Sequence, residues 1–511
     1  MRKAWPAFVV FAAFVASMID QGAAADASEV AAATRSITRD DAKKHIDILA
    51  DDTFEGREMG TRGGHAAANY LAKALEQYGL KPAGDQGSYF QTFNGQLRNV
   101  LGMLEGSDPQ LKNEVIILGA HYDHVGYGKA NNSFGPFGYI HNGADDNASG
   151  VAGLLEVAEA FKQLPTPPKR SILFALWDGE EAGLLGSKHW LANPTIPLDR
   201  VMFKINIDMI GRMENERIEV FGSRTSTNLR QIVSRANMEN PVMIDFSWKM
   251  KADSDHYPFF ERSIPTLMFH TGLHKDYHRP SDDAHLINHE GVERVARLCF
   301  LTLDQLANAP ERKAFRLTSR EENIISQARL EAPGQAPPSR FGIGWRKNPE
   351  DGQLYVVQIV PGTPGERSGI RIGDKLITYN GEPVTDQDHF HLQLLAATSP
   401  GVFKIERPGE ESPREITIEP AGNPVRIGFT WRQDDAEPRA AIVSYVIGGS
   451  AADQAGIRMR DRIYAVNDQP FASGNEFAEL LKARGPLELL VERDGRPWKV
   501  TLKTLEEPPA P

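Results

Sequence analysis

Acidic and imidazole side chains stand directly beyond short apolar segments of this 511-residue chain. The residues in these positions are His121, Asp123, Glu180, Glu181 and Asp208. Several such groups are costly to gather away from water unless a cation compensates them. Zinc accepts imidazole nitrogen and carboxylate oxygen, and a catalytic zinc site keeps one position open for water. The residue types therefore favour a metal site that activates water.

The elements that position these residues can be read from the apolar pattern. Four segments are typical of fully buried strands, over residues 114–120, 171–176, 201–207 and 264–269. Amphipathic helical patterns cover residues 148–164 and an earlier segment that stops at Gly79. Strands that alternate with helices predict an α/β fold with a mixed, mainly parallel sheet covered by helices. In such sheets ligands bind beyond the carboxyl ends of the strands.

Each of these features also has a purely structural interpretation. Asp145, Asp146 and Asn147, within the segment 142–150, fit an N-cap of the following helix. Glu180 and Glu181 fit a solvated turn, and His278 fits a surface histidine. Capping does not explain four strand-end or helix-start sites in this order along the chain. Taken together, the features favour metal coordination.

The motifs resemble the exported or lysosomal di-zinc aminopeptidases with a co-catalytic metal pair, the leucyl-aminopeptidase-like metallopeptidases. The segments that carry the resemblance are 119–123, 143–150, 180–187, 206–209 and 277–278. The resemblance extends over roughly residues 37–308 and implies the zinc exopeptidase fold.

The resemblance implies two zinc ions as cofactors. Asp146 would bridge the two ions, His121 and Asp208 would complete one site, and Glu181 and His278 would complete the other. A short shared carboxylate suits two metal ions roughly 3.5–4 Å apart. Because this set of ligands is already full, we expect four other histidines to lie outside it: His124, His141, His270 and His274.

The resemblance also assigns two residues to catalysis. Glu180 would be the general base, since neighbours in an extended chain point to opposite sides and Glu181 takes the metal. Asp123 would orient His121 from behind, as a carboxylate does in many zinc sites. A cis peptide bond after Asp146 is implied as well.

These residues predict an exported zinc-dependent aminopeptidase that hydrolyses N-terminal residues of peptides through a metal-bound water. Its substrates would be peptides with a free N-terminus. Alternatives on the same fold are a single-zinc glutaminyl cyclase and a metallo-carboxypeptidase. The alternative outside enzymes is a peptide-binding protein with an inactive peptidase domain, which would predict damage to the metal set.

A duplicated region follows a Pro-rich segment, 331–339, whose composition predicts a linker with few contacts. Ordered matches such as Gly369 with Gly456 recur at one constant offset along the chain, which indicates two copies of a small domain. Both copies resemble PDZ domains, which bind peptide or protein C-termini by strand addition. Arg460 replaces the glycine that the first copy has at Gly373, so a purely structural role of the second copy stays an alternative.

The N-terminus predicts export. Arg2 and Lys3 precede an apolar run, 4–16, and a small-residue cleavage site at 23–25 follows it. We therefore expect a signal peptide, a periplasmic or secreted protein and no integral membrane segment after cleavage. An uncleaved anchor is the alternative. The expected organisation is 1–25 signal peptide, 26–312 di-zinc peptidase domain, 313–339 helical extension and linker, and 340–421 and 422–505 two PDZ-like, β-rich domains.

Composition excludes other classes. The formal net charge of −11 makes nucleic acid an unlikely partner, because an acidic surface repels phosphate. Cys299 is the single cysteine, so neither an internal disulfide nor a cysteine-rich zinc module is possible. Its position on an apolar helical stripe predicts a buried hydrophobic role.

Overall fold

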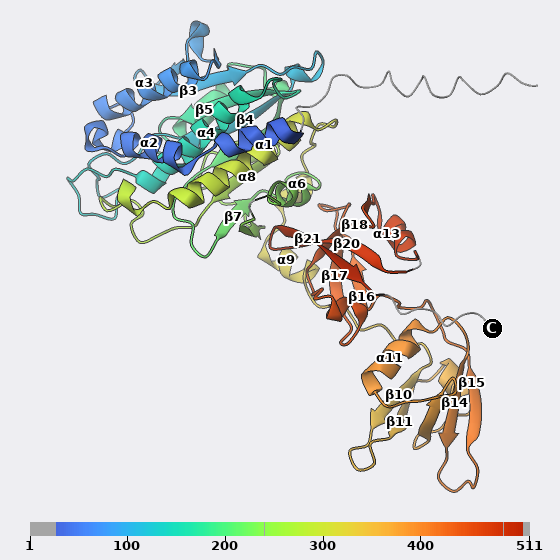
Figure 1. Cartoon of the computed structure of the whole chain (residues 1–511). Coiled ribbons are helices and arrows are strands. Elements are labelled where there is room, and N and C mark those ends of the chain that lie inside the picture. The colour runs from blue at the N-terminus through green and yellow to red at the C-terminus, as the bar shows by residue number, and fades with distance from the viewer. Residues whose placement is uncertain (1–26, 240, 484, 504–511) are drawn as a thin grey trace, which may run out of the picture. The chain divides into compact units, whose positions relative to one another are not determined.

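The computed structural model describes residues 27–239, 241–483 and 485–503, so the predicted signal peptide lies outside the described residues. The chain forms two compact units that divide between Glu321 and Glu322 (Figure 1). Among the described helices, none combines the length and the apolar character that a membrane span requires.

A nine-stranded mixed sheet forms the centre of the first unit. In spatial order its strands are β1 (Lys81–Pro82), β3 (Leu97–Leu104), β5 (Ser171–Trp177), β4 (Val115–His121), β6 (Val201–Ile207), β9 (Thr266–His270), β7 (Arg217–Phe221) and β8 (Met243–Ser247), with β2 (Phe90–Phe93) paired to β3. The four central strands, β5, β4, β6 and β9, are mutually parallel, whereas β3 and β7 run antiparallel to them. The predicted mixed, mainly parallel sheet is confirmed.

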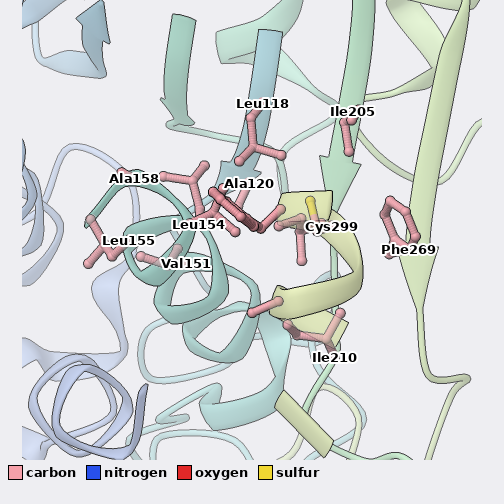
Figure 2. Packing of buried hydrophobic residues seen from close by; sticks show 14 of the residues in the cluster. Leu118, Ala120, Val151, Leu154, Leu155, Ala158, Ile205, Ile210, Phe269 and Cys299 are labelled. Atoms are coloured by element: carbon pink, nitrogen blue, oxygen red, sulfur yellow. The ribbon is translucent and has the colours of Figure 1, made fainter. Parts of the chain in front are cut away.

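Helices cover both faces of this sheet. Successive side chains of a strand point to opposite faces, so a fully apolar strand needs apolar partners on both. The helices are α1 (Ala27–Ser36), α2 (Arg39–Leu49), α3 (Arg62–Gln77), α4 (Gly150–Gln163), α5 (Leu185–Ala192), α6 (Leu229–Ala236), α7 (Tyr257–Glu261) and α8 (His289–Asn308). Leu118 faces the large core formed with α2, α4 and α8, whereas its neighbour Ile117 faces the smaller core with α5 and α7. Figure 2 shows Cys299 of α8 packed in the large core, as its apolar stripe predicts.

The second unit contains two copies of one β-rich domain. Its elements before the repeats and in the first copy are α9 (Ile324–Leu330), β10 (Ile343–Lys347), β11 (Leu354–Ile359), α10 (Pro364–Arg367), β12 (Lys375–Tyr379), β13 (Glu382–Pro383), α11 (Gln387–Ala396), β14 (Gly401–Glu406) and β15 (Arg414–Ile418). The second copy contains β16 (Phe429–Arg432), β17 (Ala441–Val446), α12 (Ala451–Gln454), β18 (Arg462–Val466), β19 (Gln469–Pro470), α13 (Gly474–Leu480), β20 (Leu487–Arg493) and β21 (Arg496–Leu502). Both sheets have the same strand order and antiparallel pairing, and each encloses its own core.

The Pro-rich segment contacts the second copy, which differs from the expected free linker. The Arg432 side chain donates to the carbonyl oxygens of Leu330 and Ala332, and the backbone N–H of Gly334 donates to Ser444. Proline removes backbone donors but leaves the carbonyl acceptors, which a guanidinium can bind. The first half of the segment therefore belongs to the second copy. Arg460 adopts the left-handed conformation (φ 73°) that Gly373 has in the first copy.

Candidate metal centre

Three parallel strands bring the predicted site residues to one edge of the sheet. His121 ends β4, Asp208 directly follows β6, and Glu180 lies just beyond the end of β5. Because β4 pairs in parallel with both β5 and β6, their carboxyl ends meet at the same edge. The structure thus brings together residues that are far apart in sequence.

One group of donor atoms consists of His121, Glu180 and Asp208. Nε2 of His121 lies 3.3 Å from Oδ1 of Asp208 and also 3.3 Å from Oδ1 of Asp146. The imidazole is almost fully buried. Removal from water raises the pKa of Glu180, and the Glu181 carboxylate raises it further, against the opposing effect of His121.

A second group consists of His124, Asp146, Glu181 and His278. Nε2 of His278 lies 3.0 Å from Oδ2 of Asp146 and 3.0 Å from Oε2 of Glu181. Nδ1 of His124 lies 2.8 Å from Oε1 of Glu181. The two adjacent glutamates therefore separate as predicted, with Glu180 in the first group and Glu181 in the second.

Asp146 joins the two groups. Its Oδ1 faces His121 and its Oδ2 faces His278, so the two oxygens of one carboxylate serve different groups. The residue lies in an irregular turn, Ala144–Ser149, and the peptide bond to Asn147 is cis. Asn147, rather than Asp146, accepts the backbone N–H of Gly150 at the start of α4. The N-cap interpretation thus fits Asn147 and leaves Asp146 to the donor groups.

The donor set fits zinc in the type of its donor atoms and in their arrangement. Every donor is an imidazole nitrogen or a carboxylate oxygen, as zinc prefers. Nε2 of His278 is buried and lies 3.0 Å from two carboxylate oxygens, yet it makes no hydrogen bond within the described chain. When a nitrogen and two carboxylate oxygens lie this close without hydrogen-bond geometry, they are arranged as ligands around a common point. The site residues could therefore hold zinc.

Asp123 is placed differently from the prediction. Its carboxylate accepts the backbone N–H groups of Glu180, at 3.0 Å, and Glu181, at 3.4 Å. Nδ1 of His121 lies closer to the carbonyl oxygen of Asp123, at 3.2 Å, than to its carboxylate, at 3.7 Å. Asp123 therefore orients His121 mainly through its backbone, and its side chain fixes the turn that carries both glutamates.

The four histidines expected outside the ligand set differ in their distance from it. His124 lies within the second donor group, with its Nδ1 2.8 Å from Oε1 of Glu181, and its place outside the ligand set stays a prediction. His141 bonds to Ser133 and to the carbonyl oxygen of Tyr139. His270 accepts a backbone N–H, and His274 lies 3.2 Å from Asp145. These last three belong to neither donor group.

Two further residues support the turn around Asp146, and sequence reasoning missed both. The Arg57 guanidinium is fully buried and donates to backbone carbonyl oxygens of Leu49, Tyr122, Asn142 and Gly143. Burial lowers the pKa of Arg57 to about 10.

Asp282, which lies four residues beyond His278, accepts the backbone N–H groups of Asp145 and Asp146. Its closeness to a predicted ligand was the only sequence signal for this role. Arg57 gave none, because an arginine in a polar turn looks like a surface residue.

A cavity of about 140 Å³ opens beside the first donor group. Asp146, Glu180 and Asp208 line it on the metal side. Its remaining walls combine apolar residues with charged ones, namely Met209, Phe221, Met268, Tyr277, Glu219, Lys251 and Asp253. The cavity has room for a small group next to the donor atoms.

Comparison with known families agrees with this architecture. Residues 99–303 match the profile described as Peptidase family M28. Residues 355–405 and 442–493 match the profile described as PDZ domain. The first unit therefore carries a domain of peptidase family M28, and the second unit carries PDZ domains.

Individual relatives are distant and only partly covered. Leupeptin-inactivating enzyme 1 of Streptomyces exfoliatus is 26% identical over 306 residues, which is 59% of this chain and 64% of that protein. Aminopeptidase YwaD of Bacillus subtilis is 28% identical over 194 residues, 36% of this chain and 39% of that protein. The chain thus spans less than two thirds of either relative. The crystal structure of Legionella pneumophila LapA aminopeptidase superposes with a TM-score of 0.46 and 23% identity, over 56% of this chain and 76% of that one.

Proposed function

We propose that this chain is an exported zinc-dependent aminopeptidase that removes N-terminal residues from peptides. The observation that carries the proposal is the division of Asp146, whose two carboxylate oxygens face two separate groups of zinc-type donors. The residues that would hold two zinc ions are His121, Asp146, Asp208, Glu181 and His278. The aminopeptidase relatives support the same class of activity.

Bound zinc ions would supply the electrophile that polarises the scissile carbonyl and the charge that makes water a better nucleophile. Glu180 accepts a proton from the attacking water on its carboxylate and returns it to the leaving amine. Asp123 holds the backbone of Glu180 and Glu181 and so keeps the two carboxylates in separate groups. His121 is held in orientation by the carbonyl oxygen of Asp123.

The cavity beside the donor atoms supports action at a free N-terminus. A protonated α-amine is a cation, and acidic side chains including Asp208, Glu219 and Asp253 line this cavity. A cavity of about 140 Å³ accommodates one side chain rather than an extended peptide. Both features favour removal of a single N-terminal residue.

Export and peptide capture belong to the same proposal. The predicted signal segment 1–25 would direct the chain out of the cytoplasm. The first PDZ copy has a groove of about 370 Å³ between β10 and α11, lined by Ile343, Trp345 and Phe390 among others. An apolar groove beside an exposed strand suits a peptide added as a further strand.

The test is metal analysis combined with a panel of substrates. The zinc-loaded protein should contain two ions and release reporters from free aminoacyl derivatives but not from their N-acetylated forms. Release of the C-terminal residue from N-acylated dipeptides would identify a carboxypeptidase. Cyclisation of an N-terminal glutamine with one bound ion would identify a glutaminyl cyclase. A zinc-loaded protein without any of these activities would favour the binding-protein alternative.

A further inference from the structure

His124 is a buried histidine in contact with the second donor group, and neither the resemblance nor the proposed mechanism uses it. Its side chain is fully enclosed, and its Nδ1 lies 2.8 Å from Oε1 of Glu181. Its Nε2 has no hydrogen-bond partner in the described chain. Buried polar groups need hydrogen-bond partners, so the contact with Glu181 determines the orientation of the His124 ring.

We propose that His124 is a positioning residue that fixes Glu181 at the second metal site. This inference rests on the proposed zinc-dependent function. The imidazole donates its Nδ1–H to Oε1 of Glu181, which leaves Oε2 as the oxygen that faces His278. His124 thereby selects which oxygen of Glu181 is offered to the metal.

Distances favour donation over direct coordination by His124. Its Nδ1 lies 2.8 Å from Glu181 but 3.7 Å from Asp146, whereas Nε2 of His278 is equally distant from both carboxylates. Direct coordination through Nδ1 would leave an Nε2–H donor buried without an acceptor, which costs more than an unused lone pair. The hydrogen-bonded tautomer avoids this cost.

The neighbouring backbone is built around the imidazole. The ring lies so close to Gly143 that a Cβ there would come within 2.5 Å of it. Gly143 has a positive φ of 54°, which glycine adopts without strain. The adjacent Asp123 binds the backbone of the same glutamate pair. Asp123 and His124, which follow β4, thus both hold the glutamate turn: the Asp123 carboxylate binds its backbone N–H groups, and the His124 imidazole binds the Glu181 side chain.

The experiment compares metal binding by the full-length wild type, His124→Ala and His124→Asn, with His141→Gln as the control at a buried histidine outside both donor groups. Zinc affinity is measured by competition with a chromogenic chelator, and the ligand field is followed by the visible spectrum of the cobalt-substituted protein. We expect His124→Ala to lose roughly tenfold to hundredfold in affinity for one of two ions, as other residues that support metal ligands do. His124→Asn can place an amide N–H near the position of Nδ1–H and should recover most of that affinity.

The outcomes separate this inference from the proposed function. If the wild type binds two ions and His124→Ala binds both with unchanged affinity, His124 does not position Glu181. If His124→Asn fails to recover affinity and the cobalt spectrum changes as for a lost nitrogen ligand, His124 coordinates the metal directly and the inference is wrong. A wild type that binds no zinc would instead refute the proposed function. His141→Gln should bind metal as the wild type does.

Discussion

Oδ1 of Asp123 accepts the backbone N–H of Glu180 at 3.0 Å. This contact ties the end of β4 to the turn after β5 that carries both glutamates. The second oxygen of Asp123 accepts the N–H of Glu181 at 3.4 Å. The geometry of the proposed base therefore depends on the Asp123 carboxylate, which binds the backbone of the glutamate turn and does not line the cavity.

Asp123→Asn should lower turnover roughly tenfold to hundredfold, as the loss of groups behind a metal site does. The asparagine amide keeps one acceptor oxygen but turns an NH₂ group toward the second backbone N–H, so the glutamate turn loses a hydrogen bond. Steady-state kinetics on an aminoacyl reporter measure the effect, and thermal unfolding serves as the control for folding. Wild-type turnover in this variant would show that the turn does not need the contact.

Glu180→Gln should lose at least about a hundredfold in turnover while it keeps its metal, because general base catalysis contributes about that much or more. Glu180 also lies within ligand distance of His121 and Asp208, so metal content must be measured in the same sample. Glu181→Gln is the matched comparison and should lose metal. Near-wild-type activity of a zinc-replete Glu180→Gln protein would show that Glu180 is not the general base.

Asp146→Asn should lower zinc occupancy at both sites, since each carboxylate oxygen faces a different donor group. His121→Ala and His278→Ala should each affect mainly one ion. Elemental analysis after dialysis counts the ions in all three variants. Two tightly bound ions in Asp146→Asn would contradict the bridging role.

Glu156 on α4 should make stability depend on pH far from the metal centre. Burial raises its pKa to about 8 from an ordinary value of 4.5, although one oxygen accepts the N–H of Thr38. The folded state binds this proton more tightly than the unfolded state, so stability falls as pH rises from about 4.5 through about 8.

Glu156→Gln should therefore gain in melting temperature relative to the wild type as the pH rises through this window. Thermal unfolding at several pH values measures the difference, with Glu76→Gln on the exposed side of α3 as the control. A constant difference between Glu156→Gln and the wild type would show that Glu156 does not titrate in this range.

The chain shortened to residues 27–321 should fold, bind zinc and cleave short aminoacyl substrates. This span is one compact unit, and all the proposed ligands lie before residue 279. The PDZ domains should matter only for longer peptides, because strand addition needs an extended segment. A soluble, zinc-loaded 27–321 chain that is inactive on small substrates would show that the second unit contributes to catalysis.

The sequence predicted the strands at the site because β4 and β5 are apolar runs and β6 is apolar except for Lys204 and Asn206. Parallel strands then bring their carboxyl ends together. It could not predict the direction of the Asp123 carboxylate, because the two-residue spacing from His121 fixes a side of the strand but not a rotamer. His124 was excluded because the resemblance already filled the ligand set. Arg57 was missed because its partners are backbone carbonyl oxygens, which leave no pattern in side-chain types.

Arg57 determines where the chain near this site can change in length. It holds the carbonyl oxygen of Tyr122 on one side of the segment 123–141 and those of Asn142 and Gly143 on the other. Both ends of this segment are therefore fastened to a single side chain. Lengthening a loop whose ends are fixed costs little free energy. The length of the segment 125–140 can thus change without moving Asp146, as long as Ser133 and Phe134 remain, because both donate to the carbonyl oxygen of His278.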